Sequence, residues 1–386
     1  MNRRAWLRSS LIAAGSVSLM PKMGNSMPFA KQTSQSVIWE VDHPSYYGMP
    51  PEITAKLNAN ENPYGPASGV KKAISEAVGL GNRYGHGDAA ILIDMIAKKE
   101  GVTKDHIMLG PGSTDLLEKT AITRFLHGGN IVSADPSYMS LINTAQAIGA
   151  DWKAVPLTSD YAHDLPAMEA AIDSKTQLVY VCNPNNPTGS LTAGDKLRDF
   201  CSRVSTKVPI FIDEAYLDFL DDYAANTMVG LVADGKDVIV ARTFSKIYGM
   251  AGLRIGYIVA TPKRIESITS MVRSTMGLCV TSLKGAIASL QDDGFCAECK
   301  DLNTAAREYV CSELGQLGYK YIPSFTNFVL FPMKKDTDTR KFMRGMTEKG
   351  VGIRVFNIKN EPWCRVSIGT MPEMQLFTQA FKEVTA

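Results

Sequence analysis

Residues 242–254 read RTFSKIYGMAGLR, and they directly follow the apolar run VIVA at 238–241. We expect the apolar run to form a buried strand, which places Lys246 just beyond the carboxyl end of that strand. Hydroxyl side chains surround this lysine, and a second cation, Arg254, lies eight residues later. A neighbouring cation and partial burial lower the pKa of a lysine, so its free amine can attack an aldehyde.

The same stretch also offers partners for a phosphate. Thr243, Ser245 and Arg254 carry the hydroxyl and guanidinium groups that suit a phosphate dianion. An aldehyde and a phosphate on one small molecule describe pyridoxal 5'-phosphate (PLP), so the stretch predicts a PLP site with Lys246 as its covalent anchor. A lysine after a strand is otherwise an ordinary solvated loop residue, and the neighbouring motifs have to decide between the two interpretations.

Two further polar motifs close apolar runs. DEAY at 213–216 follows PIFI at 209–212, and NPNNPTG at 183–189 follows LVYV at 178–181. Ligands collect at the carboxyl ends of parallel strands, so we expect the three polar motifs to meet at one edge of a sheet. Apolar runs alternate with helix-length stretches through this part of the chain, which indicates a mostly parallel sheet covered by helices.

With these motifs the chain resembles the class I and II, fold-type I aminotransferases, most of all the histidinol-phosphate aminotransferase branch. The resemblance runs from AKLNANENPYG at 55–65 to RVSIGT at 365–370 and keeps the family's order of motifs. It implies the α/β fold of fold-type I PLP-dependent transferases. In that fold, a large domain holds the mostly parallel central sheet, and a smaller α+β domain follows.

The resemblance assigns residues to the ring of the cofactor. Asp213 would keep the pyridine nitrogen protonated, so that the ring can draw in electrons. Tyr216 and Asn186 would donate hydrogen bonds to the phenolic oxygen, and Tyr138 would stack on the ring. Each residue also has an ordinary structural interpretation: Asp213 as a cap or turn residue, Asn186 as part of a loop-forming Asn-Pro pair, and Tyr138 as plain core.

The phosphate would lie where the motif GPGSTD at 110–115 opens a helix, because backbone N–H groups are free there. By resemblance the phosphate site consists of Gly112, Ser113, Thr114, Thr243, Ser245 and Arg254.

The motif NRYG at 82–85 resembles the family element whose tyrosine reaches the phosphate of a neighbouring subunit, with glycine in place of the usual proline. The resemblance at Tyr84 therefore predicts a homodimer with shared active sites. For the substrate, the resemblance implies that Arg365 grips an acidic group, because a guanidinium binds a carboxylate through two hydrogen bonds. Arg354 is either a second anion contact or a solvated residue at a strand end, and Asn186 is also expected near the substrate.

The chain divides into four expected segments. Residues 1–30 would be an export signal or disordered, and residues 31–52 an arm that joins the small domain. Residues 53–275 would form the large PLP-binding domain, and residues 276–386 the small C-terminal domain. NRRAWLR at 2–8 resembles a twin-arginine signal, which predicts a periplasmic or secreted enzyme; the alternative is a basic tail on a cytoplasmic protein.

The composition of the chain limits the classes of partner that we expect it to bind. The chain has 386 residues and a net charge of +2, and no basic run is interleaved with aromatic residues, so we expect no nucleic acid partner. The apolar segment at 11–20 is too short to span a membrane. The five histidines form no ligand cluster, so we expect no metal. Cys296 and Cys299 form a lone CxxC motif, whose pairing the sequence does not decide.

The predicted function is the transfer of an amino group between an amino acid, or an amine like histidinol phosphate, and a 2-oxo acid by a ping-pong mechanism. Lys246 would act as general base and acid, moving the proton from the substrate's Cα to the C4′ carbon of the cofactor. The alternatives are a PLP-dependent amino-acid-phosphate decarboxylase of the same fold and a non-catalytic PLP-binding protein. We expect a free α-amino acid as donor rather than histidinol phosphate, since an exported enzyme would rarely meet a cytoplasmic intermediate.

Overall fold

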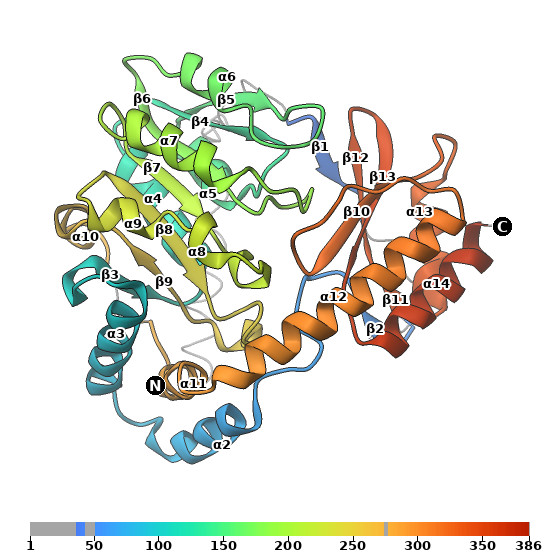
Figure 1. The fold of residues 1–386 in the computed structure, drawn as a ribbon, viewed down its shortest axis with the longest axis horizontal. Helices are drawn as coiled ribbons and strands as arrows, with labels where there is room; N and C mark the ends of the chain where they lie inside the picture. Colours follow the sequence, from blue (N-terminus) through green and yellow to red (C-terminus); the bar gives the residue numbers. More distant parts are fainter. Residues whose placement is uncertain (1–35, 43–50, 274–276, 386) are drawn as a thin grey trace, which may run out of the picture. The chain divides into compact units, whose positions relative to one another are not determined.

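The computed structural model describes residues 36–42, 51–273 and 277–385 (Figure 1). The export signal expected at residues 1–30 therefore lies outside the described residues, as do parts of the arm expected at 31–52. The domain borders at 52 and 275 stay predictions.

A seven-stranded sheet carries the apolar runs of the sequence. Its strand order is β3-β9-β8-β7-β6-β4-β5; β9 runs antiparallel to both of its neighbours, β3 and β8, and all the other pairs are parallel. The expected mostly parallel sheet is thereby confirmed. The strands are β3 (Ile107–Gly110), β4 (Asn130–Asp135), β5 (Asp151–Pro156), β6 (Thr176–Cys182), β7 (Ile210–Asp213), β8 (Val238–Thr243) and β9 (Gly256–Val259).

Helices cover both faces of this sheet because alternate residues of each strand point to opposite sides. On β7, Ile210 and Ile212 pack into one apolar cluster with α3, α7, α9 and α11. Phe211 points the other way, into a second cluster with α4, α5 and α10. These helices are α3 (His86–Glu100), α4 (Ser113–Phe125), α5 (Ser140–Ala147), α7 (Gly194–Val204), α9 (Val229–Ala233), α10 (Pro262–Thr269) and α11 (Val280–Ser289).

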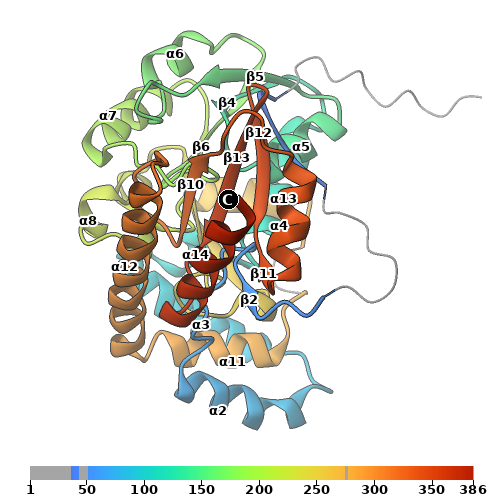
Figure 2. The same cartoon turned by 90° about the vertical axis from the view of Figure 1, so that its right-hand side faces the viewer.

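A second, antiparallel sheet has the order β1-β12-β13-β10. A third apolar cluster lies between it and the helices α12, α13 and α14, and Figure 2 shows α13 and α14 in front of β12 and β13. The elements are β1 (Ile38–Glu40), β10 (Phe328–Pro332), β12 (Arg354–Ile358), β13 (Glu361–Ser367), α12 (Asp293–Gln316), α13 (Thr339–Glu348) and α14 (Met371–Thr385).

Short elements connect these layers. They are β2 (Ala55–Lys56), which pairs with β11 (Val351–Gly352), the helices α2 (Ser68–Ala77), α6 (Leu165–Ala170) and α8 (Tyr223–Asn226), and the 3-10 turns η2 (Val78–Leu80), η3 (Lys104–His106), η4 (Leu217–Phe219) and η5 (Ala251–Leu253). Across the described ranges, no helix is long and apolar enough to cross a membrane. Nor do those ranges hold a group of three His, Cys, Asp or Glu side chains that could bind a metal.

Candidate active site

A cavity of about 370 Å³ lies at the carboxyl ends of β6, β7 and β8. Most of the residues predicted from the sequence line it, although they come from segments far apart in the chain. The predicted residues in its wall are Ser113, Thr114, Tyr138, Asn186, Asp213, Tyr216, Thr243, Ser245, Lys246, Arg254, Arg354 and Arg365.

Lys246 lies in the turn that follows β8. Its Nζ donates a hydrogen bond to the carbonyl oxygen of Asn60 at 3.1 Å and lies 5.5 Å from the centre of the Tyr216 ring. Burial lowers the pKa of Lys246 to about 8, and the positive charge of Arg365 adds to this effect. The neutral amine required of a nucleophile is therefore accessible near neutral pH.

Asp213 ends β7 and is only 2% exposed. One carboxylate oxygen accepts a hydrogen bond from the backbone N–H of Ala215 at 3.2 Å, and the other accepts one from the Tyr180 hydroxyl at 3.5 Å. Burial raises the pKa of Asp213 to about 6, while the charge of Lys246 opposes the rise. A cationic ring nitrogen placed beside this carboxylate would favour its ionised form.

Tyr216 presents its hydroxyl to two amides. Asn60 donates to that oxygen at 3.0 Å and Asn186 at 3.5 Å, and Phe328 packs edge-on against the ring at 5.3 Å between centroids. The sequence predicted Tyr216 and Asn186 as partners of one cofactor oxygen, and the structure places them side by side. Their roles stay predictions.

The expected phosphate cradle is built tightly around Arg254. Gly112 has a φ of 82°, and a Cβ at that position would lie 2.4 Å from Nη2 of Arg254. Glycine is therefore required where the guanidinium approaches the backbone. Arg254 Nη1 also donates to the Ser245 hydroxyl at 3.4 Å, and α4 begins at Ser113, where unpaired backbone N–H groups attract anions. This donor set fits the phosphate of PLP.

Arg365 is 4% exposed and is held on several sides. Its Nη1 donates to Oδ1 of Asn186 at 2.8 Å, and its Nη2 donates to the carbonyl of Asn58 at 3.1 Å. The rings of Phe328 and Phe356 lie 5.3 and 5.5 Å from the guanidinium carbon. Burial lowers the pKa of Arg365 to about 10, and the buried Nε has no partner among the described residues.

Arg354 is the second arginine in the cavity wall. It lies directly opposite Arg365 in the register of β12 and β13. Its Nη1 forms an ion pair with Oε2 of Glu40 at 3.2 Å, so the acidic partner comes from β1. Arg354 is therefore at a strand end and also in the cavity wall, and its role as an anion contact stays a prediction.

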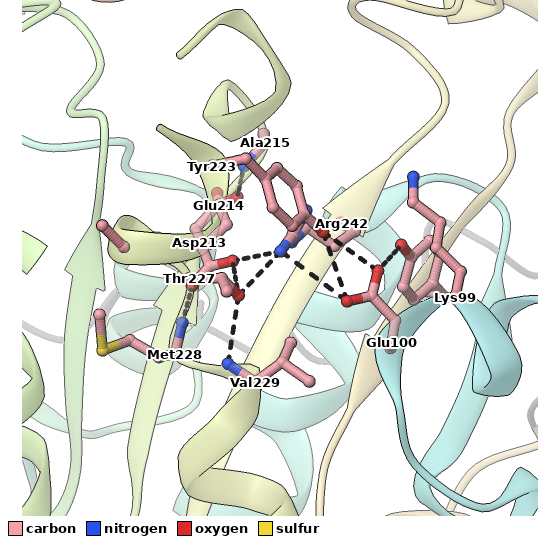
Figure 3. A network of polar contacts seen from close by, with 12 residues as sticks. Lys99, Glu100, Asp213, Glu214, Ala215, Tyr223, Thr227, Met228, Val229 and Arg242 are labelled. Carbon is pink, nitrogen blue, oxygen red and sulfur yellow. Dashed lines mark hydrogen bonds and ion pairs between the residues drawn. The ribbon is translucent and has the colours of Figure 1, made fainter. Parts of the chain in front are cut away.

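A buried ion network lies behind the strand ends (Figure 3). Glu214 follows Asp213 in the chain, but its carboxylate pairs with Arg242 of β8 at 2.8 Å. Arg242 also contacts Glu100 at 4.0 Å and donates to the Thr227 hydroxyl at 3.0 Å. The exposed fractions of the Arg242 and Glu214 side chains are 3% and 1%. The network ties the ends of β7 and β8 together directly beside the residues that face the cavity.

Two predicted residues do not line the cavity. Gly112 supports it from behind through Arg254, and Tyr84 is 77% exposed on the surface. Sequence reasoning in turn missed Asn60 and Glu61, which line the cavity, and it assigned no role to Tyr180. Asn60 and Glu61 lie within the motif at 55–65 that carries the family resemblance, so that motif was the available signal. Cys296 and Cys299 are free thiols.

The comparisons with known proteins agree with this geometry. Residues 52–381 match the family Aminotransferase class I and II. A histidinol-phosphate aminotransferase of Moorella thermoacetica (strain ATCC 39073 / JCM 9320) is 36% identical over 333 residues, which cover 86% of this chain and 85% of the relative. Another, from Cupriavidus pinatubonensis (strain JMP 134 / LMG 1197), is 35% identical over 87% of this chain and 89% of its own length.

Solved structures show the same fold. A putative histidinol-phosphate aminotransferase from Erwinia carotovora atroseptica SCRI1043 has a TM-score of 0.81 at 28% identity, covering 88% of this chain and 99% of the other. The histidinol-phosphate aminotransferase of Sinorhizobium meliloti, solved in complex with pyridoxal-5'-phosphate, has a TM-score of 0.80 at 29% identity, covering 86% and 91%. The family match, the fold and the cavity with its lysine, aspartate and arginines lead to one conclusion: the chain belongs to the class I and II aminotransferases and is a PLP-dependent aminotransferase.

Proposed function

We propose that the amino donor of this aminotransferase is a free α-amino acid whose carboxylate binds Arg365. The observation that carries this proposal is the position of Arg365, a buried guanidinium with an unpartnered Nε in the same cavity wall as Lys246. The planar fork of an arginine matches a carboxylate, and the Asn186 bond holds that fork in one orientation.

The other residues follow from this placement. When bound, PLP supplies an electron sink, which lowers the pKa of the substrate's Cα–H group. Lys246 is then the general base that takes the Cα proton and the general acid that delivers it to the C4′ carbon of the cofactor. When PLP is bound, Asp213 would hold the ring nitrogen, and Tyr216 with Asn186 would hold the phenolic oxygen. Ser113, Thr114, Thr243, Ser245 and Arg254 would hold the phosphate, and Tyr138 would stack on the ring.

Histidinol phosphate is the second candidate donor. Several relatives carry the name histidinol-phosphate aminotransferase, and Arg354 beside Arg365 would give two cations for one phosphate. We favour the α-amino acid because Glu40 already pairs with Arg354.

The donor is tested by comparing kcat/KM for histidinol phosphate with a panel of L-amino acids. A clear preference for histidinol phosphate would remove the first candidate. Arg365→Lys should raise the KM for the amino acid about tenfold or more, since a point charge does not replace a bidentate fork. The exposed Arg340 of α13 serves as a control: Arg340→Lys should leave the KM unchanged.

We also propose that the enzyme is a homodimer in which Tyr84 completes the neighbouring active site. Tyr84 is 77% exposed, and nearby Val78 and Leu80 are 65% and 47% exposed, so this surface is suited to apolar contact. Mixing Tyr84→Phe chains with Lys246→Ala chains should give heterodimers with one intact site and therefore more activity than either parent. Heterodimers that form without such a gain would count against a shared site.

Export through the twin-arginine motif is the remaining proposal. Folded export suits an enzyme that loads PLP before it leaves the cytoplasm. Changing Arg3→Lys together with Arg4→Lys should retain the protein in the cytoplasm, which cell fractionation measures. An unchanged distribution would show that the N-terminal cations are only a basic tail.

A further inference from the structure

Two arginines, which carry the same charge, lie side by side on neighbouring strands of the small sheet. Arg354 on β12 and Arg365 on β13 are direct cross-strand partners, and both line the cavity. Like charges directly opposite each other in a sheet destabilise it unless an anion lies nearby. The positive charge of Arg354 contributes to the lowered pKa of Arg365, so the two groups interact. The pair therefore calls for a compensating negative charge.

Glu40 provides one such charge from a distant part of the sequence. Its carboxylate reaches Arg354 at 3.2 Å, across 314 positions of chain. The pairing is fixed by the backbone: β1 runs antiparallel to β12 with Glu40 opposite Phe356, and the N–H of Val41 donates to the carbonyl of Val355 at 2.9 Å. Glu40 thus belongs to the small sheet and holds a defined place beside Arg354, which lines the cavity.

The two arginines are compensated unequally. Within the described parts of the chain, no ion pair joins Arg365 to a carboxylate, whereas Arg354 has Glu40. Glu61 also lines the cavity, but no ion pair connects it to either arginine there. The side chains of Glu40 and Arg354 are 39% and 38% exposed, so their contact is weak and open to competition from a ligand.

We infer that Glu40 is a selectivity residue, which masks the charge of Arg354 and disfavours donors that carry a second acidic group. The inference rests on the proposed function, because it assigns Arg365 to the α-carboxylate. With Glu40 in place, Arg354 is available to a substrate group only after its internal ion pair has been broken. A substrate carboxylate or phosphate next to Arg354 must displace Glu40 or bind beside its negative charge. A neutral side chain meets no such competition.

The test compares donors of matched shape and different charge. L-glutamate and L-glutamine differ at the end of the side chain by one negative charge, and histidinol phosphate and histidinol differ by the phosphate. The measured quantity is the ratio of kcat/KM for the charged member to that for the neutral member. Glu40→Gln should raise this ratio about three- to fivefold through the KM of the charged donor, with kcat for the neutral donor unchanged.

Two further variants separate this role from a structural one. Glu361 lies in the same sheet and pairs with Lys335 at 2.7 Å, outside the cavity wall, so Glu361→Gln should leave the ratio unchanged. In an Arg354→Gln background, the effect of Glu40→Gln on the ratio should shrink to the weaker influence that Glu40 has on Arg365, because Glu40 acts mainly through Arg354. Arg354→Gln alone should lower the ratio, which gives a second measurement if Glu40→Gln folds poorly.

An unchanged ratio in Glu40→Gln would overturn the inference, as would an equal change in Glu361→Gln or a full effect without Arg354. These outcomes leave the proposed donor intact, because the donor depends on Arg365. Conversely, a wild-type preference for histidinol phosphate would remove the proposed donor. The role of Glu40 would still be decided by the effect of Glu40→Gln on the histidinol phosphate to histidinol ratio.

Discussion

The two sheets of this enzyme contribute functional groups in different ways. The parallel sheet supplies residues where its strands end: Asp213 closes β7, Lys246 follows β8 and Asn186 follows β6. The antiparallel sheet supplies residues from within paired strands, so Arg354 and Arg365 face each other by register. Strand ends allow several loops to converge on one cofactor, whereas a strand pair sets two charges at a fixed spacing.

The ion pairs of the two regions also differ in how far they are exposed to solvent. Arg242 and Glu214 are almost fully buried behind the ends of β8 and β7, while Arg354 and Glu40 are more than one third exposed. A buried pair costs much when one partner is removed, because the remaining charge stays unsolvated, whereas an exposed pair is replaceable by water. We therefore expect changes in the first region to affect the reaction itself and changes in the second to affect substrate preference.

Loss of the covalent anchor should have the largest effect. Lys246→Ala should reduce turnover about 10³-fold, since the general base at the substrate's Cα disappears. Borohydride reduction of the holoenzyme and peptide mapping should place the pyridoxyl group on Lys246 in the wild type. A label on any other lysine would contradict the assignment of the strand-end region.

The buried Arg242 and the exposed Arg354 allow a direct comparison of how much each ion pair contributes to the free energy of unfolding. Arg242→Met should lower the free energy of unfolding by about 3 kcal/mol, because Glu214 and Glu100 would lose their buried cation. Arg354→Met should change it by less than about 1 kcal/mol. Chemical denaturation of the apoenzymes measures both. Equal losses in the two variants would show that burial does not distinguish these ion pairs.

A variant of Asp213 tests whether the large sheet affects the reactivity of the cofactor in addition to binding it. Asp213→Asn should keep PLP bound, since the phosphate cradle around Arg254 is untouched, but reduce turnover about 10²-fold. Cofactor content is measured by absorbance and turnover by a coupled assay. Normal turnover with full PLP content would leave Asp213 a structural role only.

The sequence predicted the strand-end region better than the small sheet. Lys246, Asp213 and Asn186 each follow an apolar run, so local pattern locates them. Within the large sheet itself, the edge strand β5 reads DWKAVP, in which only Trp152 and Val155 are buried, so no apolar run marks it. Glu40 has no local signal at all, because its partner Arg354 is brought near only when β1 pairs with β12.

The smallest expected effect is a shift in the pH dependence of cofactor loading, and it links the two regions. The neutral amine of Lys246 attacks the aldehyde of PLP, so the loading rate of the apoenzyme should rise with pH and level off above the pKa of about 8.

Burial is the main cause of the low pKa of Lys246, and the charge of Arg365 is the next. Arg365→Gln removes a cation, which raises the pKa of Lys246 and moves the midpoint to higher pH. Arg354→Gln is the matched control, because Arg354 is not among the largest causes of the low pKa of Lys246, so the midpoint of this variant should move much less. Stopped-flow absorbance across neutral to alkaline pH measures the three profiles. A midpoint that moves in neither variant would mean that the small sheet does not influence the lysine of the large one.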